Sequence, residues 1–106
     1  MDYLSRKEEH VLLTIWKLQS DAYGVTIREQ VSETTGQYWS IGAIYDVLDR
    51  LYRKGYVSTK IGEPSTERGG KRKRFYRLTK QGYEALQQVK EIRDSLWSNL
   101  PNLAFE

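Results

Sequence analysis

The chain has 106 residues, no cysteine and a net charge of +3, and this length predicts one domain with a modest core. The absence of cysteine excludes disulfides and thiolate metal sites. No apolar run reaches the roughly 20 residues that a membrane span needs, and the first ten residues lack a signal-peptide pattern, so we expect a cytoplasmic protein with no membrane partner.

The positive charge is concentrated in one stretch. Residues 50–80 carry 11 basic and two acidic side chains, a net +9, whereas the rest of the chain carries six basic and 12 acidic side chains, a net −6. Such segregation favours a polyanionic partner, although a solvated basic loop has the same composition. Double-stranded DNA is therefore the first partner to consider.

A first helix is predicted to begin after Ser5, because Ser5 and Glu8 match the capping-box pattern S-x-x-E. It should end near residues 20–21. One apolar stripe is formed by Leu4, Val11, Ile15 and Leu18. The apolar surface is extended round the helix by Leu12, Leu13 and Trp16. A helix that is apolar on more than one side is usually buried on more than one side, so a second subunit is expected to cover part of it.

The next two helices form a helix-turn-helix pattern. The second is predicted at about 25–35, with Ile27 and Val31 facing inward and Gly36 as its C-terminal stop. A short connection then leads to a third helix over 40–54, with Ser40 as its N-cap. Two helices joined by a short Gly-containing turn are typical of DNA-binding domains, although many helical hairpins look alike.

The third helix has the features of a recognition helix. Its predicted apolar stripe is Ile41, Ile44, Leu48 and Leu51. The residues predicted to face DNA are Ser40, Gly42, Ala43, Tyr45, Asp46, Arg50 and Arg53, with Asp49 on the same face. The small residues of the first turn would let the backbone approach DNA, and the arginines would reach phosphates. Asp46 is four residues before Arg50, so it could hold that side chain or accept from a cytosine amine. The alternative is an ordinary amphipathic helix with a solvated face.

A β-hairpin is predicted to follow, with strands at 56–61 and 72–78 and a polar loop at 62–71. A hairpin directly after a helix-turn-helix is a wing. The basic residues expected to bind phosphate or enter a minor groove are Arg68, Lys71, Arg72, Lys73 and Arg74.

A last helix is predicted at 80–99, with Thr79 as its N-cap and Pro101 beyond its end. At about 30 Å it is longer than so small a core needs. We expect a two-fold dimer interface made by Leu13, Trp16, Leu86, Val89, Ile92, Arg93, Leu96, Trp97 and Leu100. The alternative is a helix that folds back on its own domain. Arg93 would pair with a carboxylate across the dimer or point into a space between subunits.

Several motifs, taken together, carry a resemblance to a known family. They are YG at 23–24, SIGAIY at 40–45, L-x-x-L at 48–51, KGYV at 54–57, GGKRK at 69–73, FYRLT at 75–79, and Gly82. Over about residues 9–98 the chain resembles the PadR family of bacterial transcriptional regulators, in particular its short subfamily with a single C-terminal helix. The resemblance implies an α+β, mostly α, fold: a winged helix-turn-helix domain at 1–79, then a dimerisation helix and short tail at 80–106.

The resemblance also implies a mechanism, that of a homodimeric repressor with the third helix in the major groove and the wing beside it. Tyr23 and Gly24 are then expected at a phosphate. Some short members of the family bind flat aromatic compounds between tryptophans of the dimer, so Trp97 and Arg93 are the residues for a possible small aromatic effector. Packing of Trp97 in the dimer is the alternative. The chain departs from the family pattern at Ile41, Ala43 and Asp46, so no operator sequence carries over.

Nothing in the sequence indicates an enzyme. His10 is the single histidine, and no catalytic triad, phosphate-cradling loop or metal cluster is visible. We therefore expect no catalysis, no cofactor and no metal. The competing function is a winged-helix protein-interaction module without specific DNA binding, which the basic wing argues against.

Overall fold

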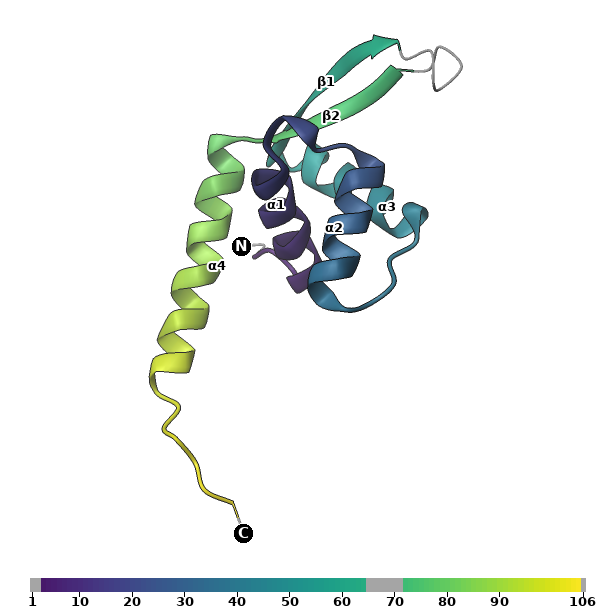
Figure 1. Cartoon of the computed structure of the whole chain (residues 1–106). Coiled ribbons are helices and arrows are strands. Elements are labelled where there is room, and N and C mark those ends of the chain that lie inside the picture. Colours follow the sequence, from purple (N-terminus) through teal and green to yellow (C-terminus); the bar gives the residue numbers. More distant parts are fainter. Residues whose placement is uncertain (1–2, 65–71, 106) are drawn as a thin grey trace.

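The structure is a computed structural model that describes residues 3–64 and 72–105. Its elements in chain order are α1 (Arg6–Leu18), a 3₁₀ turn (Gln19–Asp21), α2 (Gly24–Thr35), α3 (Ile41–Arg53), β1 (Val57–Pro64), β2 (Arg72–Leu78) and α4 (Lys80–Ser98). Figure 1 shows α1, α2 and α3 as a compact bundle, with the β1–β2 hairpin projecting from it and α4 running down one side. The predicted fold, a mostly helical winged helix-turn-helix with a long C-terminal helix, is confirmed.

The capping box predicted for α1 is present. The Ser5 hydroxyl accepts from the Glu8 backbone N–H at 3.2 Å, and the Ser5 N–H donates to Glu8 Oε1 at 2.8 Å. Each bond satisfies a donor that the start of a helix leaves free. The helix buries Val11, Leu12 and Ile15 in the core.

The turn between α2 and α3 also follows the predicted pattern. Gly36 adopts the left-handed conformation (φ 69°) that ends α2 without steric cost. The Ser40 hydroxyl accepts from the Ala43 N–H at 3.1 Å and caps α3. Ile27 and Val31 of α2 are fully buried, as predicted.

The buried face of α3 differs from the prediction at its first turn. Ile44, Leu48 and Leu51 are buried as expected, but Ile41 is 41% exposed and Val47 is buried instead. Trp39, just before the helix, is buried in the core cluster. Trp39 is therefore part of the core at this end of the helix, and Ile41 is not.

The wing is a two-stranded antiparallel sheet whose register runs from Val57 opposite Leu78 to Ile61 opposite Arg74, and shifts before Pro64. The strand β1 extends three residues into the stretch predicted as loop. Gly62 permits this, because a Cβ there would lie 2.6 Å from the ring of Phe75. The predicted wing residues Arg68 and Lys71 lie outside the described residues.

The first half of α4 packs against the chain's own core. Thr79 caps the helix by accepting from the Gly82 N–H at 3.1 Å. Leu86 joins the core cluster and Val89 packs against it. Leu86, predicted at a dimer interface, is only 9% exposed and so has little surface left for a partner. The end of α4 and the tail after it extend past the bundle (Figure 1).

Candidate nucleic-acid interface

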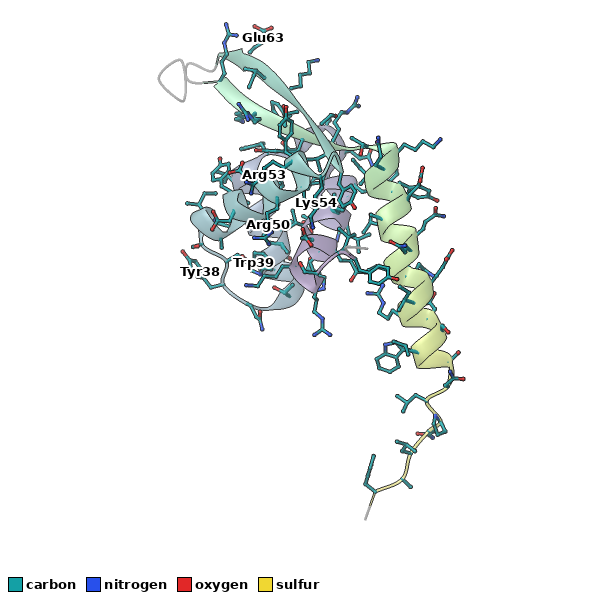
Figure 2. The ribbon with its side chains drawn as sticks, turned by 180° about the vertical axis from the view of Figure 1, so that it is seen from behind. Tyr38, Trp39, Arg50, Arg53, Lys54 and Glu63 are labelled. Atoms are coloured by element: carbon teal, nitrogen blue, oxygen red, sulfur yellow. The ribbon has the colours of Figure 1, made fainter. Side chains whose placement is uncertain are left out.

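The outer face of α3 carries small, aromatic and charged side chains. Its exposed residues are Ile41, Gly42, Tyr45, Asp46, Asp49, Tyr52 and Arg53. Ala43 and Arg50, predicted on this face, are only partly exposed and lie on one flank of the helix. Tyr52 was not among the predicted site residues, although it lies two turns after Tyr45 and so on the same side. In Figure 2, Tyr38 and Trp39 lie near the start of α3 and Arg53 lies toward the wing.

Tyr45 connects α3 to the start of α2. A Cβ at Gly24 would overlap the hydroxyl of Tyr45, so this glycine allows the tyrosine to lie against the first turn of α2. The Tyr23 N–H donates to Thr26 Oγ1 at 3.0 Å within that turn. The structure therefore brings together Tyr23, Gly24 and Tyr45, which the sequence places in two separate motifs.

The base of the wing docks on the same turn of α2. The ring of Tyr23 packs edge-on against Phe75, with centroids 5.6 Å apart. Lys73 lies over the same tyrosine, with its Nζ 4.3 Å from the centroid of the Tyr23 ring. A hydrogen bond of 2.8 Å from the Tyr76 N–H to the Ala22 carbonyl fixes β2 beside this turn.

These contacts border an open cavity of about 410 Å³ where α2, α3 and β2 meet. It is lined by Tyr23, Gly24, Val25, Tyr45, Asp49, Arg72, Lys73, Arg74 and Tyr76. Burial raises the pKa of the Tyr76 hydroxyl against the opposing effect of Arg74, so the phenol stays neutral. Three cations beside the positive end of a helix suit a phosphate group, with Asp49 as the one acidic residue of the lining.

Arg50 has a different partner from the one predicted. Its Nε lies 3.8 Å from Glu8 Oε2, and Lys54 Nζ lies 2.9 Å from the same oxygen. No ion pair joins Arg50 to Asp46 in the part of the chain that the structure describes. The Glu8 side chain is 4% exposed. Burial raises its carboxyl pKa, but the Ser5 N–H and the Lys54 ammonium outweigh this and hold the pKa below its ordinary 4.5. The pairing spans more than 40 residues of sequence, so helical spacing could not reveal it.

Arg93 also pairs within its own chain. Its Nη1 lies 2.6 Å from Glu9 Oε2 and 2.7 Å from Glu9 Oε1. Within the chain, this pair joins α4 to α1, and the two roles predicted for Arg93 toward a second subunit stay predictions. The apolar residues that remain exposed around this contact are Leu13, Trp16, Ile92, Leu96, Trp97 and Leu100.

No group of three or more His, Asp or Glu side chains lies close enough to hold a metal ion among residues 3–64 and 72–105. In the same ranges, no helix combines the length and the apolar character that crossing a membrane requires.

Comparison with known proteins identifies the family of the chain. The profile of the PadR-like transcriptional regulator family matches residues 11–88. The chain belongs to this family. It is thus a transcriptional regulator of the winged-helix type. No curated protein matches the chain.

Solved PadR-like structures have the same fold. A PadR-like transcription factor from Bacteroides fragilis is 24% identical over 87% of this chain and 84% of that chain, with a TM-score of 0.74. A PadR-like regulator from Bacillus cereus is 21% identical over 87% and 84%, with a TM-score of 0.71. A complex structure of RosR from H. salinarum is 25% identical over 93% and 79%, with a TM-score of 0.67.

Proposed function

We propose that this PadR-like regulator binds double-stranded DNA as a homodimer, with α3 in the major groove and the wing against the adjacent backbone. The observation that carries the proposal is the convergence of α3, the start of α2 and the base of β2 around one basic cavity. Phosphate contacts of this kind fix the register of a protein on DNA, and base contacts from the helix specify the sequence.

The outer face of α3 suits close approach to base edges. Gly42 has open space around its missing Cβ, and Ser40 before it is exposed. Arg53, exposed at the wing end of the helix, would reach a phosphate. Asp46 would accept from a cytosine amine, the base-edge donor that carboxylates recognise in the major groove.

The proposed dimer uses the apolar surface that the single chain leaves uncovered. Trp97 is 64% exposed and Leu96 is 70% exposed on α4, and Leu13 and Trp16 on α1 are also exposed. Large apolar side chains left exposed in this number favour a protein contact. A symmetric dimer would have to hold its two α3 helices roughly 34–36 Å apart, the spacing of successive major grooves.

We further propose that the regulator is a repressor and that a small aromatic effector relieves its binding at the Trp97 surface. Such a ligand would act by changing the spacing of the two α3 helices. Because Arg93 is paired with Glu9, the exposed indole of Trp97 is the group that supports this proposal. Unchanged operator affinity in Trp97→Ala at unchanged mass, with no effect of aromatic compounds on wild type, would count against it.

The test is fluorescence anisotropy of a labelled duplex from the protein's own upstream region, against a scrambled duplex, from about 50 to 200 mM salt. We expect preference for the native duplex and a steep loss of affinity with salt. Equal, salt-sensitive binding to the two duplexes would mean that the protein binds DNA nonspecifically or that this duplex lacks its operator. No binding to either duplex at low salt would refute it and favour a protein-interaction module.

A further inference from the structure

A second cavity lies on another side of the helical bundle. Its volume is about 870 Å³, and α1, the end of α2, the turn at 37–39 and the start of α3 line it. We call it the basic groove and define it by Arg6, Lys7, His10, Lys17, Tyr38 and Trp39. Its lining contains no acidic residue.

The cations of the basic groove have no carboxylate partners in the described part of the chain. The ion pairs there involve Glu8, Glu9 and Asp94, and none includes Arg6, Lys7 or Lys17. Arg6 and Lys7 also stand in the first turn of α1, where the helix dipole disfavours positive charge. An anion in the groove would relieve both effects.

Aromatic side chains form the other part of the groove. Trp39 is buried, and its Nε1–H donates to Thr35 Oγ1 at 3.3 Å. Lys7 Nζ lies 5.9 Å from the centroid of this ring. Beside it, Tyr38 is 81% exposed. A fixed indole, an exposed phenol and several unpaired cations are a combination suited to a sugar–phosphate backbone.

The position of the basic groove relative to α3 decides which part of a bound DNA duplex the groove could contact. Tyr45 and Arg50 are five residues apart and so project about 140° apart on the helix. Tyr45 faces the start of α2 at Gly24, whereas Arg50 faces α1 at Glu8. Ala43 lines the groove and lies on the Arg50 flank. The groove and the cavity at the wing are therefore on opposite flanks of α3.

We propose that the basic groove binds phosphates of the DNA strand on the side of α3 opposite the wing. A helix in a major groove has one phosphate strand on each side. The cavity at β2 would take one strand, and Arg6, Lys7 and Tyr38 would take the other. This inference rests on the DNA binding of the proposed function and extends the contact to α1.

The test measures the affinity of Arg6→Gln/Lys7→Gln for both the native and the scrambled duplex across a salt series. Losing one phosphate contact lowers affinity about eightfold near 0.1 M salt, because counterion release scales with about the 0.9 power of salt concentration. We expect a similar loss on both duplexes and a salt slope reduced by up to about 1.8 for two contacts. The melting temperature should not fall, because the variant removes positive charge from a helix N-terminus.

Two single variants make the outcome decisive. Lys90→Gln, which breaks the exposed Lys90–Asp94 pair on α4, should bind DNA as wild type does. Lys73→Gln at the wing should weaken binding. If Lys73→Gln weakens binding and Arg6→Gln/Lys7→Gln retains wild-type affinity and slope, the role of the groove is refuted and the proposed function stands. If wild type binds no duplex, both fall.

Discussion

Replacing Glu8 by alanine tests how α1 supports the recognition helix. The change removes a buried carboxylate that accepts from the Ser5 N–H at 2.8 Å and lies 2.9 Å from Lys54 Nζ. The lost capping interaction costs about 1 kcal/mol. The lost ion pair adds about 1–2 kcal/mol, below the value for a fully buried pair, because Lys54 remains 30% exposed and partly solvated. We expect the free energy of unfolding to fall by about 2–3 kcal/mol.

The assay is urea unfolding at pH 7 and fixed protein concentration, followed by circular dichroism. The matched control is Glu84→Ala, which removes an exposed glutamate from α4 and should change stability by less than about 0.5 kcal/mol. Equal stability of Glu8→Ala and Glu84→Ala would refute the stabilising role of this carboxylate.

The pH dependence of the stability of wild type and Glu8→Gln gives an independent check. The folded-state pKa of Glu8 is held below its ordinary 4.5. Its contribution to stability is therefore present above pH 4.5 and is lost as the pH falls through the folded-state value. The stability difference between wild type and Glu8→Gln should shrink on acidification below that point. A difference that stays constant from pH 7 to about 3 would contradict the assigned ionisation.

Three further changes test contacts elsewhere. Gly82→Ala places a Cβ against the backbone carbonyl of Tyr56, so we expect a loss of about 2 kcal/mol or more in urea unfolding; wild-type stability would contradict that packing. Gly24→Ala places a Cβ against the ring of Tyr45, so it should lower stability. In a double-mutant cycle, Gly24→Ala should cost much less stability in the Tyr45→Ala background, whereas additive losses would exclude the contact. Trp97→Ala should weaken the proposed dimer at least tenfold by analytical ultracentrifugation, since an exposed indole is a typical interface anchor, and an unchanged dimer would exclude it from the interface.

Local signals predicted the element boundaries well, because caps act within a few residues. Ser5, Gly36, Ser40 and Thr79 each stand where the structure begins or ends a helix. The periodic pattern also predicted most of the buried face of α3. It failed at the first turn, where Ile41 is exposed and Trp39, just before the helix, is buried in the core cluster. A residue before a helix has no place in a helical periodicity.

The electrostatic contacts of the site were less predictable, because they join residues far apart in sequence. The helical spacing of Asp46 and Arg50 suggested a local pair, but a buried carboxylate on α1 is the partner instead. Arg93 likewise pairs with Glu9, 84 residues away. A glutamate in the first turn of a helix is usually explained by capping and the helix dipole. Nothing in the sequence therefore distinguishes Glu8 and Glu9 as ion-pair partners of residues on other helices.

Glu8 and Glu9, adjacent in α1, join this helix to both the proposed DNA-binding element and the proposed dimerisation element. Consecutive residues on a helix project about 100° apart, so Glu8 faces α3 while Glu9 faces α4. Each is buried and ion-paired, Glu8 with Lys54 and Glu9 with Arg93. One turn of α1 therefore holds the end of α3 and the middle of α4 in a fixed relation. In the proposed dimer, the separation of the two α3 helices would follow the placement of α4 through this turn.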